Sequence, residues 1–224
     1  MAGKIILFIV EGASDETALG SYLTEKFKEK KFTLTIRIMG GDITTAWVEE
    51  YTKNTFEVTP RNINVKLTEL ITKYLKSSEA SLLGIKPKDI GKVYYVTDTD
   101  NCFNLTASEK INKAKCMETM FTFREIKINK QKIVPLEVIF FGENLEHITQ
   151  GRLENFSDKE KEEFAEEFAF RSLTEPNFFE NIFRSKDIKQ WNDYTESYKA
   201  IKTYSGRSCN MNNLLDEIEN EIIL

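Results

Sequence analysis

Acidic residues follow two apolar runs of this sequence, in each case close to the point where the run ends. Six apolar residues, Ile5–Val10, are followed directly by Glu11. A second run, Val93–Val96, is followed closely by Asp98 and Asp100. Carboxylates gathered in one place repel one another unless a cation offsets their charge, and a hard divalent cation completed by water or phosphate oxygens is the usual partner. Each acid alone is typical of a cap or a loop, but the repeated pattern indicates a shared metal site.

The two apolar runs predict the strands that would position these acids. Neither run alternates with polar residues, which is typical of strands that are buried on both faces. In an open parallel sheet, ligands bind beyond the carboxyl ends of the strands. If the two strands are neighbours, we expect Glu11, Asp98 and Asp100 to converge at the carboxyl end of one sheet.

Other segments complete an alternating α/β pattern. Apolar spacing predicts helices over 15–30, 43–53, 62–77 and from about 108, the first with Ser14 as its N-cap. Strands are expected over 32–38, as a half-exposed strand near an edge, and over 134–141. From 143 to 224 the pattern is almost entirely helical, with breaks near 157, 176, 187 and 206.

Strands alternating with helices indicate an α/β fold with a mostly parallel sheet flanked by helices. We expect residues 1–150 to form this core, with an insertion near 40–90. Residues 151–224 are expected to form a helical C-terminal extension packed on the core. That helical tail is equally compatible with pairing between subunits of a homo-oligomer.

Composition excludes several classes of protein. The 224 residues are 41% hydrophobic and 30% charged, as in an ordinary globular domain. No apolar run approaches the roughly 20 residues that span a bilayer, and the N-terminus lacks the features of a signal peptide. We therefore expect a cytoplasmic protein without membrane association. The net charge of −5 disfavours a protein that coats nucleic acid, but it leaves room for a local basic surface.

The residue types also restrict the metal. The sequence has a single histidine, His147, and its cysteines, at 102, 116 and 209, are not at the spacing of a zinc site. A catalytic metal would therefore be held mainly by oxygen. This favours Mg²⁺ or Mn²⁺ over zinc.

Three further residues are candidates because of the strands that they follow. Asp42 comes after the 32–38 strand and would either face the site or cap a helix. Glu143 and His147 come after the 134–141 strand, at the same end of the sheet as the acids. There His147 would be placed for proton transfer, although a lone histidine is more often a packing residue.

Two lysines follow the second acidic motif. Lys110 and Lys113 lie about one turn apart on the helix that starts near 108. We interpret them as residues that could contact a nucleic-acid backbone. The alternative is that they belong to an ordinary solvated helix face.

These motifs resemble a known family. The stretch ILFIVEGASDE at 6–16, followed by YVTDTD at 95–100, is similar to the Toprim domain of topoisomerases, primases and OLD-family nucleases. That family has a glutamate after its first strand and Asp-x-Asp after its third. The stretch around Glu11 is most similar to OLD-like and small stand-alone Toprim proteins of prokaryotes, many of them encoded among phage-defence genes. The resemblance covers about residues 4–141.

The resemblance implies a function and roles for individual residues. Glu11 matches the family's acid/base or metal-linked glutamate, and Asp98 and Asp100 match its Mg²⁺-binding pair. Asp15 matches an acid that can assist a second metal. These matches imply a Mg²⁺-dependent nuclease, or a related phosphotransferase, acting on nucleic-acid phosphodiesters. The sequence has no P-loop, so any ATPase or trigger would come from a protein partner.

Two other functions stay open at this point. The chain could be a Toprim-fold binding or effector subunit that has little activity alone and needs a partner. It could also be a phosphatase of the haloacid-dehalogenase type, which likewise places Asp-x-Asp after a buried strand. That family usually continues with Gly and Thr or Val, where this chain has Asn101 and Cys102, and its nucleophile normally follows the first strand.

Overall fold

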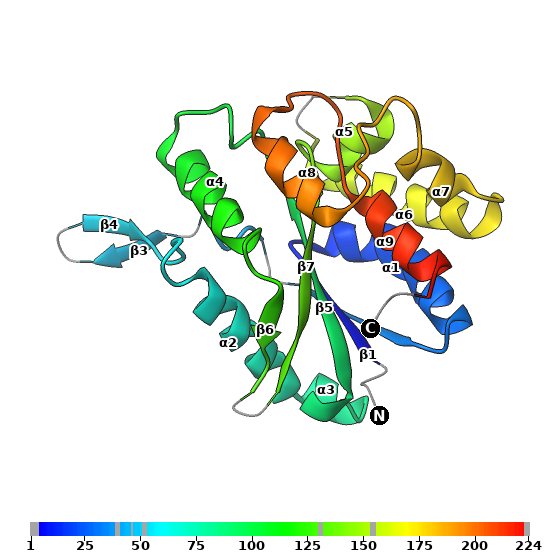
Figure 1. The fold of residues 1–224 in the computed structure, drawn as a ribbon, viewed down its shortest axis with the longest axis horizontal. Coiled ribbons are helices and arrows are strands. Elements are labelled where there is room, and N and C mark those ends of the chain that lie inside the picture. Colours follow the sequence, from blue (N-terminus) through cyan, green and yellow to red (C-terminus); the bar gives the residue numbers. More distant parts are fainter. Residues whose placement is uncertain are drawn as a thin grey trace.

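A five-stranded sheet runs through the middle of the molecule, as Figure 1 shows for the computed structural model of the chain. The structure describes residues 5–38, 41–45, 47–50, 53–129, 132–152 and 156–221. The strand order is β2-β1-β5-β7-β6, with bounds Thr33–Ile38, Ile5–Val10, Ile90–Asp98, Ile133–Phe141 and Glu125–Lys127. Neighbours from β2 to β7 are parallel, and β6 is antiparallel to β7. The prediction of an α/β fold with a mostly parallel sheet is confirmed, and so is the edge position of β2.

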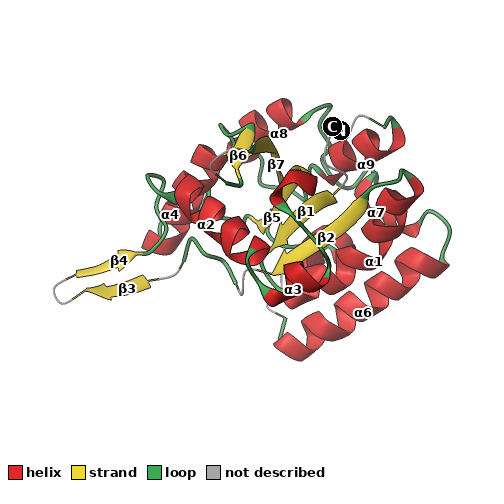
Figure 2. Ribbon diagram, turned by 90° about the horizontal axis from the view of Figure 1, so that it is seen from below, coloured by secondary structure: helices red, strands yellow, loops and turns green. Residues whose placement is uncertain are grey.

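Helices cover both faces of this sheet. The helices α2 (Ile63–Leu75) and α4 (Ser108–Met120) lie on one side, whereas α1 (Ala13–Glu29) and α6 (Asp158–Thr174) lie on the other (Figures 1 and 2). The shorter helices are α3 Ser78–Leu82, α5 Leu145–Gln150, α7 Phe178–Phe183, α8 Tyr194–Ala200 and α9 Met211–Glu219, with 3₁₀ turns over Pro87–Asp89 and Ile201–Thr203. Among the residues just delimited, no helix is both long and apolar enough to cross a membrane.

The two central strands are buried, as their unbroken apolar runs predicted. Residues 6–10 of β1 are at most 1% exposed, and residues 90–97 of β5 are all buried. Helices pack on both faces, so side chains pointing either way from these strands meet apolar neighbours. The strand β5 is longer than the predicted Val93–Val96 and ends at Asp98 itself. The acid therefore stands at the carboxyl end of the sheet.

The helix expected over 43–53 is wrong. Residues 43–45 form a turn, and the described residues that follow form an antiparallel hairpin of β3 (Trp47–Glu50) and β4 (Lys53–Phe56). This hairpin projects from the body of the molecule in Figure 1. Asp42 Oδ1 accepts hydrogen bonds from the backbone N and the Oγ1 of Thr44, an arrangement that competes with a helix. Aromatic and β-branched residue types in both strands also favour extended backbone.

The N-cap of α1 also differs from the prediction. The helix begins at Ala13, so Gly12 rather than Ser14 is the N-cap. Asp15 Oδ2 accepts a hydrogen bond from the backbone N of Gly12 at 2.9 Å. Asp15, the third residue of the helix, thus makes the reciprocal contact of a capping box, to the backbone of the N-cap, and not the contact that an N-cap serine makes. This contact fixes Asp15 next to the end of β1.

The chain after residue 150 packs on the sheet and on α1. The Asn210 side chain hydrogen-bonds to the backbone of Val138 and Phe140 in β7, and the Tyr198 hydroxyl also contacts Val138. The long helix α6 packs against α1. The break expected near 157 is a helix start, because Ser157 caps α6. The stretch predicted as almost entirely helical is divided by loops into α5–α9.

Candidate functional site

The first and third strands of the main sheet bring the predicted acids to one place. Glu11 follows β1 directly, and β1 pairs with β5, which ends at Asp98. Both strands run in the same direction, so their carboxyl ends meet. Thr97 Oγ1 donates a 2.5 Å hydrogen bond to Glu11 Oε1 across this junction. The side chain of Glu11 is therefore held against β5 and not released to solvent.

The loop after β5 is shaped by backbone contacts with the end of β7. Asp100 and Asn101 have φ values of +45° and +56°, in the left-handed region. Asn and Asp adopt that region more readily than most residues. The backbone N of Asp100 donates to Glu143 O at 2.8 Å, and Glu143 N donates to Thr99 Oγ1 at 2.8 Å. These bonds turn the Asp100 carboxylate toward α4.

The side chain that meets it there is Lys113 of α4. This lysine is fully buried, and its Nζ lies 2.7 Å from Asp100 Oδ2, 2.8 Å from Asp42 Oδ2 and 3.7 Å from Glu11 Oε1. Lys113 is thus placed inside the molecule, neither on a solvated helix face nor at a surface that a nucleic-acid backbone reaches. A buried ammonium is stable only when it is paired, and here three carboxylates surround it. Lys110, 23% exposed, lies 3.5 Å from Asp100 Oδ2.

The two carboxylate oxygens of Asp42 have different contacts, one within a turn and the other in the acidic cluster. Its Oδ1 accepts the hydrogen bonds from Thr44, whereas its Oδ2 faces Lys113. The Nζ of Lys113 lies 2.8 Å from Oδ2 and forms an ion pair with it. The geometry of this contact is not that of a hydrogen bond, and the buried Oδ2 accepts no other one. Asp42 therefore faces the site, whereas the alternative of a helix cap is wrong, because its other oxygen holds a turn.

Asp98 and Asp15 form the other half of the cluster. Burial raises the pKa of Asp98 well above its ordinary value, and the charges of Asp15 and Glu11 raise it further. Burial likewise raises the pKa of Asp15, and the charge of Glu146 adds to the effect. Glu146, on α5 and 5% exposed, is a site neighbour that the sequence interpretation missed. In the described part of the chain, neither Asp98 nor Asp15 has a salt bridge.

The pKa values of two carboxylates in the cluster, Glu11 and Asp100, are shifted in opposite directions. Burial raises the pKa of Glu11 to about 7, and the Asp42 charge adds to this, while Lys113 and the Thr97 hydroxyl oppose it. Burial acts the same way on Asp100, but the charge and hydrogen bond of Lys113 outweigh it and lower the pKa of Asp100. Despite burial, the surrounding acids raise the pKa of Lys113 well above its ordinary value. The lysine is therefore charged, and Glu11 is poised to exchange a proton near neutral pH.

His147 and Glu143 lie beside this cluster, around a small cavity of about 30 Å³. His147 is 8% exposed, and its Nδ1 lies 3.1 Å from Gly142 O. Asn144 Oδ1 caps α5 by accepting a hydrogen bond from the backbone N of His147. The cavity also reaches Thr99 and Asn101 of the acidic loop. A catalytic role for His147 stays a prediction.

The carboxylate cluster is the candidate site for a metal ion. Within the ranges that the structure covers, no group of three or more His, Cys, Asp or Glu side chains is arranged to hold a metal. The chemistry of the donors nevertheless suits a hard cation, because all of them are carboxylates. The hydroxyl of Tyr95, fully buried and without a hydrogen bond, has its pKa raised by burial and by the charges of Glu11 and Asp42. An unsatisfied polar atom thus adjoins the cluster.

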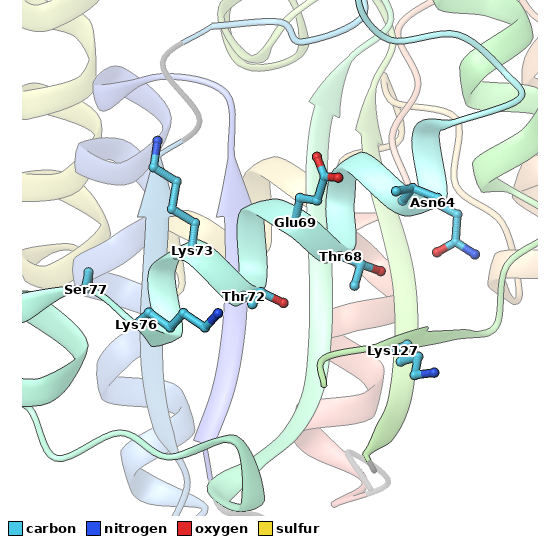
Figure 3. Close-up of a pocket in the computed structure, with 9 residues that line it drawn as sticks. Asn64, Thr68, Glu69, Thr72, Lys73, Lys76, Ser77 and Lys127 are labelled. Atoms are coloured by element: carbon cyan, nitrogen blue, oxygen red, sulfur yellow. The ribbon is translucent and has the colours of Figure 1, made fainter. Parts of the chain in front are cut away.

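A larger groove lies elsewhere, on the outer surface of α2. It has a volume of about 850 Å³, and Figure 3 shows that its lining side chains come mainly from α2, with Lys127 from β6. None of its lining residues belongs to the carboxylate cluster. The carboxylate cluster and this groove are therefore separate features of the molecule.

Comparison with known proteins adds no relative. No protein-family model, no curated protein and no solved structure matches this chain. The functional argument therefore depends on the fold and on the carboxylate cluster.

Proposed function

We propose that this protein is a Mg²⁺- or Mn²⁺-dependent nuclease of the Toprim type that cleaves nucleic-acid phosphodiesters. One observation carries the proposal: Glu11 and Asp98 come from neighbouring parallel strands, and their charges interact in a buried setting with more carboxylates than cations. The Toprim pattern places its glutamate and its Asp-x-Asp on the first and third strands. Here β1 and β5 are the first and third strands of the main sheet along the chain.

Each residue of the cluster has a proposed task. Asp98 and Asp15 would hold the metal, because neither of them forms a salt bridge among the described residues. When bound, Mg²⁺ supplies positive charge that offsets the charge developing on the phosphate oxygens. Glu11, with its pKa raised to about 7, takes a proton from the attacking water. Lys113 holds Asp42 and Asp100 in place.

The reaction is a hydrolysis. The water oxygen forms a bond to phosphorus while the bond from phosphorus to one ester oxygen breaks. The water proton passes to Glu11, and the departing oxygen takes a proton from solvent water. No external oxidant, reductant or nucleotide is needed for this step.

The proposal is tested by incubating the purified protein with supercoiled plasmid, single-stranded DNA and RNA, in Mg²⁺ or Mn²⁺. We expect cleavage by the wild type that EDTA abolishes and that an Asp98→Ala/Asp100→Ala variant lacks. A Glu162→Ala/Glu163→Ala variant is the matched control, because it removes two exposed carboxylates from α6. Equal cleavage by the wild type and the Asp98→Ala/Asp100→Ala variant would show that the activity does not belong to this site.

A second function is favoured by a specific observation. Lys113 already places a cation among three of the acids, as in a site that works without metal. The protein would then be a binding or effector subunit of the same fold, which needs a partner. Absence of cleavage with either metal, together with partner binding that persists without Mg²⁺ and after loss of Asp98, would select this function.

A further inference from the structure

We propose that the open edge of strand β2 is a docking site for a partner protein, which adds an extended segment rich in basic and apolar residues to the sheet. The site is the groove that runs along β2. It goes beyond the proposed function, because none of the residues lining this groove belongs to the carboxylate cluster.

The strand β2 has a pairing partner on one side alone. In the described part of the chain it pairs with β1, and it is the outermost strand of the sheet (Figure 2). An edge strand presents a row of unpaired backbone N–H and C=O groups, which native proteins often protect with lysine, proline or a bulge. The sequence of β2, TLTIRI, has one arginine but neither lysine nor proline, and its register with β1 is unbroken. It is therefore a regular edge to which another strand can add.

A groove of about 770 Å³ lies along this edge, and part of its lining is Leu34, Thr35 and Ile36 of β2. The helices α1 and α6, from one face of the sheet, line it as well. Its other wall comes from α3, which contacts α2 of the opposite face. The strand edge thus lies between walls from both faces of the sheet, as an added strand requires.

Two leucines on different walls of the groove are exposed to solvent. Leu83 of α3 is 64% exposed, and Leu173 of α6 is 53% exposed. Apolar side chains gathered within a polar rim are typical of a surface that binds another protein. A segment added to β2 would cover both leucines with its own apolar side chains.

The charged residues that line the groove are all acidic. They are Glu16 and Glu25 of α1 and Glu79 of α3, and no lysine or arginine is among the described lining residues. Lys28 pairs with Glu25 at 3.4 Å, but both side chains are exposed, and such a pair contributes little. Charge complementarity therefore selects a basic partner. Because successive side chains of a strand point to opposite faces, the segment needs basic and apolar residues on each face.

The test measures binding of the fluorescein-labelled peptide KKVVKKVV by fluorescence anisotropy, in EDTA so that no metal takes part. In this peptide, lysine and valine alternate along each face of an extended strand. We expect saturable binding by the wild type, weakened about tenfold or more in a Glu25→Lys/Glu79→Lys variant. The matched control is Glu162→Lys/Glu163→Lys, the same change of charge at two exposed positions of α6 outside the groove. It is expected to bind as the wild type does.

A second peptide tests whether the segment binds as a strand. It has the same sequence, with N-methyl groups on two consecutive central residues. Consecutive residues direct their backbone donors to opposite sides, so this change blocks both edges of the peptide and leaves its charge unaltered. We expect the methylated peptide to bind about tenfold more weakly or worse, because the backbone bonds to β2 are lost.

Several results would overturn the docking site. Equal binding by the wild type and the Glu25→Lys/Glu79→Lys variant would do so, as would a methylated peptide that binds like the unmodified one. Absence of peptide binding would also overturn it. A wild type that then sediments as a dimer, with a monomeric Leu83→Lys variant, would assign the edge to a second copy of this chain. None of these results bears on metal-dependent cleavage, which is measured separately.

Discussion

Two buried lysines of this protein, Lys92 and Lys113, differ in the balance of charges around them. Lys92, early in β5, pairs with the single carboxylate of Glu217 on α9 at 2.8 and 3.0 Å. The hydroxyls of Tyr94 and Tyr194 donate to the same carboxylate, the second at 3.4 Å. The charge of Glu137 also interacts with Lys92 and Glu217, and Arg124 acts on Glu137, so two carboxylates meet two cations. This balanced network ties the C-terminal helix to the sheet.

Lys113, near the other end of β5, meets three carboxylates, with two more close by. Charges of one sign remain in excess, and this costs stability unless a ligand compensates. A balanced buried pair needs no ligand, whereas an unbalanced cluster is typical of a functional site. The comparison teaches that the ratio of charges, more than the burial of a lysine, separates a structural network from a candidate site.

The largest expected effect tests the balanced network. A Lys92→Met change leaves Glu217 without its cation, and we expect a loss of about 3–5 kcal/mol in the free energy of unfolding, measured in urea. A Lys92→Met/Glu217→Leu variant is the control and is expected to recover most of that loss. If the double variant is as unstable as the single one, packing rather than charge pairing explains the network.

The next effect concerns pH and the unbalanced cluster. Burial raises the pKa of Glu11 from 4.5 to about 7, so the folded state binds this proton more tightly than the unfolded state. Stability must then fall as pH rises from 4.5 to 7, by about 3 kcal/mol from this group. Urea unfolding in EDTA is expected to show this decline in the wild type and a shallower one in Glu11→Gln. Parallel pH profiles for the two proteins would contradict the raised pKa.

A third effect has opposite signs in the two regions. We expect Asp98→Asn to stabilise the metal-free protein at pH 7 by about 1–3 kcal/mol, because it removes a carboxylate that burial and its acidic neighbours disfavour. The same change in the balanced network, Glu217→Gln, is expected to destabilise it, because Lys92 loses its counter-charge. Thermal melts in EDTA measure both. Destabilisation by both changes would remove the distinction between the two regions.

The smallest effect is at the margin of the cluster. Lys110→Met removes a partly exposed ion pair at 3.5 Å, and the expected change in unfolding free energy is at most about 1 kcal/mol. Urea unfolding of this variant sets the background for changes made deeper in the site. A loss as large as that of Lys92→Met would mean that Lys110 belongs to the buried charge network.

Sequence patterns identified those strands whose apolar residues form an unbroken run. The unbroken apolar runs of β1 and β5 indicated strands buried on both faces, and their ends located Glu11 and Asp98. The helix predicted over 43–53 failed because local spacing cannot show that residues 47–50 pair with residues 53–56 as β3 and β4. Which strands are neighbours also depends on contacts that are distant in sequence.

The burial of Lys113 was the main feature that the sequence analysis did not predict, since lysines are almost never fully buried. A signal was nevertheless present. Lys113 lies three, four and seven residues before Cys116, Met117 and Met120, all buried on α4. A lysine that shares the apolar face of a helix must reach a buried counter-charge. Following that face would have directed Lys113 toward the acids of the neighbouring strands.

The hydrogen bond between Thr97 and Glu11 joins residues that are 86 positions apart, which has a consequence for the folding pathway. Closing so long a loop is slow, so the acids are brought together only when β1 and β5 pair. Their mutual repulsion is then a late event, felt mainly in the native state. We expect changes that relieve it, such as Asp98→Asn, to slow unfolding and leave the refolding rate nearly unchanged in stopped-flow experiments.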